Sequence, residues 1–217
     1  MGKRKLWAAS ISVIGAAFFS LGAYAAAVNI TPSLEKFTVK HGGKDVTVMR
    51  VQDQKNVIAP GFAKTSRKCP PFCIQPYSPA KGVNTVGEVE VIDFMLTKLK
   101  DGSGVLMDAR TPDWHIKGTI PGSVNIPFKD VNRSKGANDI TIEDAFEKMG
   151  VSFKGSGWDF STAKDVVLYC NGPWCGQSPA AIHGLIALGY PPGKLHYYRG
   201  GMQLWQSFGL TVVAPAE

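Results

Sequence analysis

An apolar strand that runs straight into a cysteine-containing loop constrains the fold of this chain more than any other feature. The predicted strand covers residues 166–169, and Cys170 follows it directly. Ser178 and Pro179 are a good N-cap and a good first helical residue, so the loop joins a strand to a helix. The helix dipole and the free N–H groups of such a loop would stabilise a thiolate. We therefore expect the chemistry of this protein at Cys170.

The alternation of strands and helices extends over the chain from residue 85 onward. Short apolar strands are predicted at 105–108, 123–126 and 194–198, in addition to 166–169. Thr85 and Glu88 fit a capping box that opens a helix, and further helical stretches are predicted at 142–149, at 179–188 and after Gly200. This order predicts an α/β fold whose parallel sheet is covered by helices on both faces. Ligand sites of such sheets lie at the carboxyl ends of the strands, where Cys170 is.

The first 25 residues have the layout of a secretory signal. Lys3, Arg4 and Lys5 precede an uncharged run over residues 6–24, and small residues at Ala23 and Ala25 fit a cleavage site. We expect an exported protein, periplasmic in a two-membrane bacterium. A retained membrane anchor is the alternative, because the uncharged run is long enough to cross a bilayer.

Residues 26–84 are predicted to be an N-terminal extension. Alternating apolar residues over 36–51 indicate a β-hairpin, and the stretch 56–84 indicates an irregular, Pro-rich connector. Cys69 and Cys73 lie in the middle of this connector, where a short disulfide would staple a loop that has no core of its own.

The composition of the chain restricts its possible binding partners and the kinds of cysteine site that it can form. The chain has 24 Lys and Arg against 17 Asp and Glu, and three of the positive charges fall in the predicted signal. The remaining excess is mild and does not interleave with aromatic residues, which argues against nucleic acid and favours small anions or proteins. The four cysteines permit three disulfide pairings, and their spacings do not fit a metal site, so we expect neither a metal nor a cofactor.

Two further motifs carry a resemblance to a known family. Residues 108–127 hold an Asp-x-Arg followed by an Ile-Pro-Gly-Ser-Val-Asn-Ile-Pro run, and residues 199–205 read Arg-Gly-Gly-Met-Gln-Leu-Trp. Together with the strand that ends in Cys170, they resemble the signatures of rhodanese-like domains over residues 85–217. The resemblance implies a three-layer fold with a mainly parallel five-stranded sheet. It also implies that Cys170 is the sulfur-carrying nucleophile and that Asp108 and Arg110 are a structural ion pair.

The loop after Cys170 departs from the pattern of that family. It is longer than the usual loop, and residues 171–177 contain no Lys or Arg. Anion binding would therefore depend on backbone N–H groups and the helix dipole. The residues expected to form this anion-binding loop are Asn171, Gly172, Trp174, Cys175, Gly176 and Gln177.

With a second cysteine, Cys175, in the loop, three hypotheses for function stay open. The first is an exported sulfurtransferase that passes sulfane sulfur from a donor such as thiosulfate, through a Cys170 persulfide, to a thiol acceptor. In the second, Cys175 is a resolving thiol and the pair exchanges disulfides with a redox protein partner. The third is a sulfur- or partner-binding module without catalytic activity.

Overall fold

A computed structural model of the chain describes residues 27–214. The predicted signal sequence therefore lies outside the described residues. Within residues 27–214, no helix is long and apolar enough to cross a membrane.

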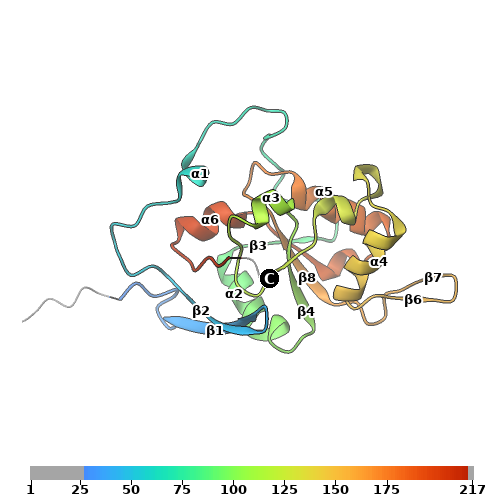
Figure 1. Ribbon diagram of the computed structural model, residues 1–217, viewed down its shortest axis with the longest axis horizontal. Coiled ribbons are helices and arrows are strands. Elements are labelled where there is room, and N and C mark those ends of the chain that lie inside the picture. The colour runs from blue at the N-terminus through green and yellow to red at the C-terminus, as the bar shows by residue number, and fades with distance from the viewer. Residues whose placement is uncertain (1–26, 215–217) are drawn as a thin grey trace, which may run out of the picture.

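A five-stranded parallel sheet forms the centre of the molecule (Figure 1). Its strands, in spatial order, are β3 (Asn84–Val86), β9 (Leu195–Tyr198), β8 (Asp165–Tyr169), β4 (Gly104–Asp108) and β5 (Val124–Asn125). Every neighbouring pair is parallel, with Leu106 of β4 opposite Val167 of β8. The predicted α/β fold class is confirmed.

Helices cover both faces of this sheet. One face carries α2 (Glu88–Phe94), its continuation as a π-helical turn (Met95–Leu99), and α6 (Gly201–Ser207). The other face carries α4 (Asp139–Lys148) and α5 (Gln177–Ala187). Successive residues of a strand point to opposite faces, so Leu106 joins the first core and Met107 the second, and both are fully buried.

The predicted N-terminal hairpin consists of β1 (Lys36–His41) and β2 (Lys44–Met49), which pair antiparallel. One face of the hairpin, with Phe37, Val39 and Val48, packs into the core beneath α2 and α6. The alternation seen in the sequence follows from this arrangement, because only one face of the hairpin is buried.

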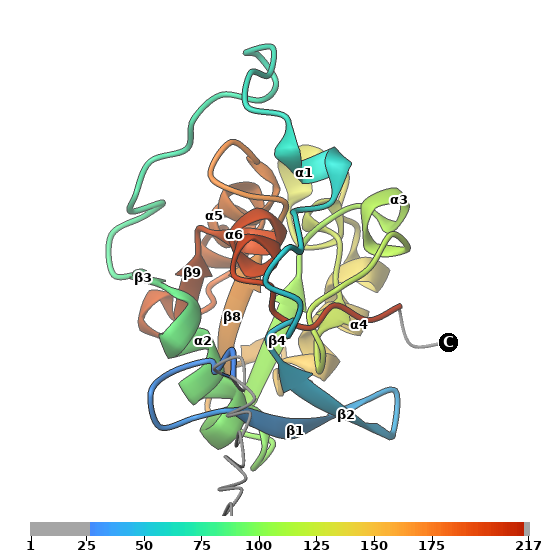
Figure 2. The ribbon, with the colours of Figure 1, turned by 90° about the vertical axis from the view of Figure 1, so that its left-hand side faces the viewer.

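Short elements complete the fold. A second hairpin, β6 (Ser152–Lys154) and β7 (Gly157–Asp159), was not predicted from the sequence. Single helical turns occur at α1 (Pro60–Ala63), α3 (Pro112–His115), Phe128–Asp130, Arg133–Lys135 and Pro192–Lys194. The connector between β2 and β3 forms a long arch that passes through α1 and returns to the edge of the sheet (Figure 2).

Two predicted helix starts were wrong. Thr85 lies in the edge strand β3, opposite Tyr197, and α2 begins only after Gly87. The Gly87 N–H donates to Glu90 Oε2 at 3.0 Å. Glu90, and not Glu88, therefore caps the start of the helix. Helix α5 begins at Gln177, before Ser178, because Gly176 takes the N-cap position.

Candidate active site around Cys170

Cys170 directly follows β8, at the carboxyl end of the central strand of the sheet. Its main chain is held by the start of α6: the Met202 N–H donates to the Cys170 carbonyl, and the Gln203 N–H to the Asn171 carbonyl, both at 3.0 Å. Gly201 makes this approach feasible, because a Cβ there would lie 2.3 Å from the Cys170 carbonyl oxygen. The loop that holds Cys170 and the motif at residues 199–205 therefore meet in one site.

The Cys170 side chain is buried, because only 2% of the residue is exposed. Burial by itself raises the pKa of this thiol. The Cys175 thiol, the Ser178 hydroxyl and the backbone N–H groups of Ser178 and Gly172 donate to the thiolate and outweigh burial, which lowers the pKa of Cys170 to about 7. The surroundings of Cys170 therefore favour the thiolate form of its side chain.

Cys175 is the protonated member of the pair. Its hydrogen bond to Cys170 and its own burial raise the pKa of Cys175 well above the ordinary value for a thiol. Both cysteines are free and buried, and the disulfide of the described residues joins Cys69 to Cys73. Cys170 and Cys175 are thus neighbours in the loop, and neither is part of a disulfide.

Ser178 is a neighbour of the Cys170 thiol, whereas the sequence predicted only a capping role for it. Since α5 begins before it, the Ser178 side chain lies inside the first turn and is fully buried. Among residues 27–214 its hydroxyl has no hydrogen-bond partner, so it is available to stabilise the Cys170 thiolate, whose pKa it helps to lower.

Asp108 and Arg110 form a buried ion pair under the loop. Arg110 Nε and Nη2 donate to the two Asp108 carboxylate oxygens at 2.8 and 2.6 Å, and Arg110 Nη1 lies 3.4 Å from Asn171 Oδ1. Although burial opposes ionisation, the bonds from Arg110 and His115 hold the pKa of Asp108 at about 2. The pair therefore stays charged and supports the first residue after Cys170.

Thr119 belongs to the same buried network. Its hydroxyl donates to Asp108 Oδ2 at 2.9 Å, and His115 Nδ1 lies 2.8 Å from the same oxygen. The Tyr169 hydroxyl, at the end of β8, lies 2.6 Å from the Thr119 hydroxyl. This network connects the Asp-x-Arg motif to the strand that ends at Cys170.

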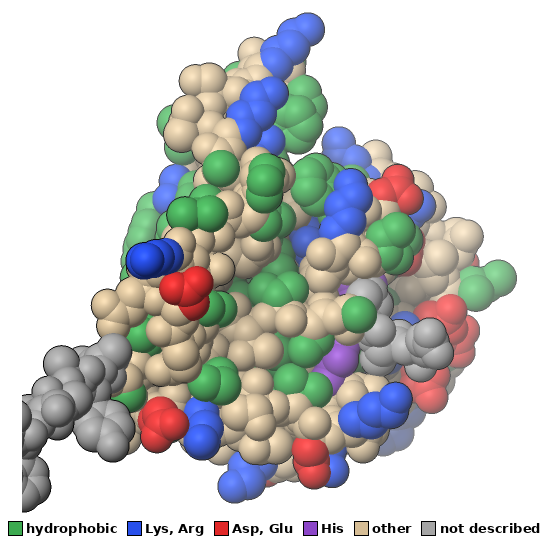
Figure 3. All heavy atoms as spheres, turned by 60° about the vertical axis from the view of Figure 1, so that its left-hand side comes forward, with side chains coloured by type: hydrophobic (Ala, Val, Ile, Leu, Met, Phe, Trp, Pro, Cys, Tyr) green, Lys and Arg blue, Asp and Glu red, His purple; other side chains and the backbone are tan. Residues whose placement is uncertain are grey.

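The connector packs against the outer side of the loop, in a segment that we call the strap (residues 59–76). The Gln75 N–H donates to the Pro173 carbonyl at 2.8 Å, and Gln203 Nε2 donates to the Phe62 carbonyl at 2.9 Å. Figure 3 shows the projecting part of the molecule with Lys and Arg side chains along it. The Cys69–Cys73 disulfide lies within the strap, close in sequence to these contacts.

Trp174 is the main point of contact between the loop and the strap. Its indole Nε1 donates to Gln203 Oε1 at 2.7 Å. The guanidinium carbon of Arg67 lies 3.7 Å from the centre of its ring, and the Phe72 ring meets it edge-on with centroids 5.7 Å apart. The loop residues Gly176 and Gln177 complete the turn into α5, with Gly176 packed beside Gln75.

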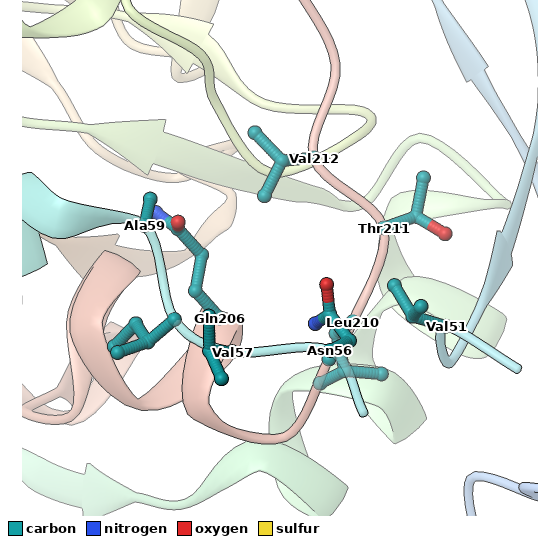
Figure 4. A pocket seen from close by; sticks show the side chains of 10 residues that line it. Val51, Asn56, Val57, Ala59, Gln206, Leu210, Thr211 and Val212 are labelled. Atoms are coloured by element: carbon teal, nitrogen blue, oxygen red, sulfur yellow. The ribbon is translucent and has the colours of Figure 1, made fainter. Parts of the chain in front are cut away.

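A groove of about 430 Å³ lies elsewhere on the molecule, between the connector and the C-terminal segment. Its lining residues include Asn56 and Val57 of the connector, Gln206 of α6, and Leu210, Thr211 and Val212 (Figure 4). None of its lining residues belongs to the 170–177 loop, so the groove is separate from the candidate active site. Across residues 27–214, no group of three His, Cys, Asp or Glu side chains could hold a metal ion.

Comparisons with known proteins give one family match. The model of the rhodanese-like domain matches residues 93–208. No curated protein is significantly similar to the chain.

Several solved structures are similar to the chain. The BH2092 protein of Bacillus halodurans is 19% identical, with 60% of this chain and 77% of that chain covered and a TM-score of 0.43. A rhodanese-related protein of Thermoplasma volcanium is 21% identical, with 60% and 97% covered and a TM-score of 0.39. A human single-domain sulfurtransferase is 18% identical, with 57% and 96% covered and a TM-score of 0.37.

Proposed function

The chain belongs to the family of rhodanese-like domains, and we propose that it is a sulfurtransferase whose Cys170 carries sulfane sulfur as a persulfide. One observation carries this proposal: Cys170 lies at the carboxyl end of β8, before the start of α5, where hydrogen bonds from Cys175, Ser178 and Gly172 lower the pKa of its thiol to about 7. A thiolate with these donors is a suitable nucleophile at neutral pH.

The proposed reaction has two steps. The Cys170 thiolate attacks the outer sulfur of thiosulfate, the bond between the two thiosulfate sulfurs breaks, and sulfite leaves with the bonding electron pair. The terminal sulfur of the Cys170 persulfide is then attacked by a thiolate acceptor or by cyanide, and Cys170 is released as the thiolate. Neither step needs an oxidant or a reductant.

The same donors would stabilise the persulfide anion. The N–H groups of Gly172 and Ser178 favour the negative charge on the sulfur and so help to lower its pKa, and the buried Ser178 hydroxyl has no hydrogen-bond partner in the described part of the chain. Arg110 adds a positive charge behind the loop. Its burial opposes that charge, but Asp108 and, with a smaller effect, the Cys170 thiolate raise the pKa of Arg110. The resting and persulfide forms therefore meet the same set of donors.

Thiocyanate formation from thiosulfate and cyanide tests this function. We expect turnover in the wild type and in Cys175→Ser, and no turnover in Cys170→Ser. Both substitutions exchange a buried thiol for a hydroxyl in the same loop, so each is a structural control for the other. Equal turnover in Cys170→Ser and the wild type would refute the proposal.

A second function is favoured by the hydrogen bond between the two thiols of the loop. The Cys175 thiol could attack the inner sulfur of a Cys170 persulfide, form a Cys170–Cys175 disulfide and release hydrosulfide, which takes the Cys175 proton. A dithiol protein partner would then reduce this disulfide by exchange. If neither turnover nor disulfide formation occurs, the domain is a sulfur- or partner-binding module.

A further inference from the structure

Two guanidinium groups flank the tip of the Cys170 loop. Arg67 of the strap stacks on Trp174, with its Cζ 3.7 Å from the ring centre. Arg199, which follows β9, donates from Nη2 to the Gln75 carbonyl at 2.9 Å, and Gln75 in turn donates to Pro173. Both arginines are half-buried and are therefore held against the same turn of the loop.

The stacking leaves the hydrogen-bonding edge of Arg67 available. A guanidinium that lies on an aromatic face uses its own face, while its N–H groups point outward in the plane. Arg67 Nη2 donates to the Gly61 carbonyl at 3.0 Å. Its buried Nε–H has no acceptor among residues 27–214, and a buried donor without an acceptor is rare in folded proteins.

Within the described part of the chain, no acidic side chain pairs with these arginines. The ion pairs there include neither Arg67 nor Arg199. The sequence from 54 to 87 contains five Lys and Arg residues, Lys55, Lys64, Arg67, Lys68 and Lys81, and no Asp or Glu. On the face shown in Figure 3, the projecting segment likewise carries blue side chains and no red ones. The strap thus places positive charge against the outer side of the 170–177 loop.

We propose that Arg67, with Arg199 beside it, binds the anionic group of the sulfur donor and so supplies the cation that the 171–177 loop lacks. The ligand would be a compound that carries its sulfane sulfur next to an oxyanion such as a sulfonate. The planar fork of a guanidinium suits two oxygens of such a group. This inference rests on the proposed function, because it assigns the substrate-binding group for the reaction at Cys170.

Alkylation of Cys170 by iodoacetate and by iodoacetamide tests the anion site without any sulfur transfer. The two reagents share one mechanism and differ in charge, so the ratio of their rates reports the local preference for an anion. In the full chain, mapped at the Cys170 peptide, Arg67→Gln should lower this ratio about fivefold. Lys64→Gln removes the same charge from an exposed position of the strap and should change the ratio less than about twofold. Arg67→Lys keeps the charge but loses the planar fork, so its preference for the anion should lie between that of the wild type and that of Arg67→Gln.

Three results would overturn the proposal: an unchanged ratio in Arg67→Gln, an equal loss in Lys64→Gln, or exclusion of iodoacetate from Cys170 in the wild type. An equal loss in both variants would instead indicate a diffuse positive surface for an acidic protein partner. The outcome is independent of turnover, so a protein that shows the Arg67 effect but makes no thiocyanate would contradict the proposed function alone.

Discussion

The sulfur of Cys170 lies 3.2 Å from the backbone carbonyl oxygen of Cys175, while the Cys175 thiol donates a hydrogen bond to the Cys170 sulfur once it is ionised. When Cys170 is protonated, it donates to the carbonyl. When it loses its proton, the neighbouring thiol takes over the bond and keeps its own proton more tightly. When the pair loses a proton, the negative charge therefore lies on Cys170.

Removal of the Cys175 donor should raise the pKa of Cys170. In Cys175→Ala, we expect an increase of about one pH unit, because a hydrogen bond to a charged group contributes about 1.5 kcal/mol. Cys175→Ser keeps a donor of similar size and should retain a pKa near that of the wild type. The pH profile of Cys170 alkylation by iodoacetamide measures this: the wild-type rate should fall about tenfold per pH unit below the pKa and level off above it. Identical midpoints for the alanine and serine variants would argue against the shared proton.

The Ser178 hydroxyl should contribute independently to the same thiolate. Ser178→Ala should raise the pKa of Cys170 by about one unit and slow its alkylation at about pH 6, where less thiolate would then be present. The fold should tolerate the change, since alanine fits a helix and the Ser178 hydroxyl has no hydrogen-bond partner within residues 27–214. An unchanged pH profile with a folded protein would remove Ser178 from the site.

The buried Asp108–Arg110 pair should matter more for stability than an exposed pair of equal length. Asp108→Asn leaves the Arg110 charge buried and should lower the free energy of unfolding by about 3 to 5 kcal/mol. The control is Asp139→Asn, which breaks an exposed pair with Arg133 at the same 2.6 Å and should change stability by less than about 1 kcal/mol. Urea denaturation measures both values, and similar losses in the two variants would contradict the structural role of Asp108.

The depressed pKa of Asp108 also predicts how stability depends on pH. The folded-state pKa of about 2 lies below the ordinary value of 3.8. The stabilisation is therefore fully present above about pH 4 and is lost as the pH falls toward about 2. In Asp108→Asn this part of the acid-induced loss should be absent.

Gly201 should be required for the position of Cys170. It has a φ of 54°, and a Cβ there would meet the Cys170 carbonyl and the Gly172 nitrogen. Gly201→Ala should therefore displace the loop and slow alkylation of Cys170 at a given pH. Gly102→Ala imposes similar strain at a φ of 80°, but its Cβ would meet nothing within 4 Å, so it should leave Cys170 unaffected. Equal effects on Cys170 would indicate a general loss of stability.

Much of the fold follows from local patterns in the sequence. The buried strands β4, β8 and β9 are short apolar runs, and α4 and α5 show helical periodicity, so each could be identified within its own stretch. The strand β3 could not, because only pairing with β9, more than a hundred residues away, makes Asn84–Val86 a strand. Taken alone, Thr85 and Glu88 fit a helix start better.

Local sequence likewise predicts one part of the candidate site but not the other. Cys170, Cys175 and the loop between them are visible as a strand–loop–helix segment, whereas the network around them is built from distant parts of the chain. The bond from Arg199 to Gln75 spans 124 residues, and the stack of Arg67 on Trp174 joins the connector to the loop. Nothing in the local sequence of Arg67 indicates that it lies against Trp174 in the loop after Cys170.

The proposed function requires that Cys170 accept a sulfur atom from a donor. The reduced full chain should be treated with thiosulfate, freed of excess donor and weighed intact, with Cys170→Ser and Cys175→Ser treated alongside. We predict a one-sulfur adduct in the wild type and in Cys175→Ser that is absent from Cys170→Ser and is removed by cyanide. No adduct at any thiosulfate concentration, or an adduct that persists in Cys170→Ser, would contradict the assignment of Cys170 as the sulfur carrier.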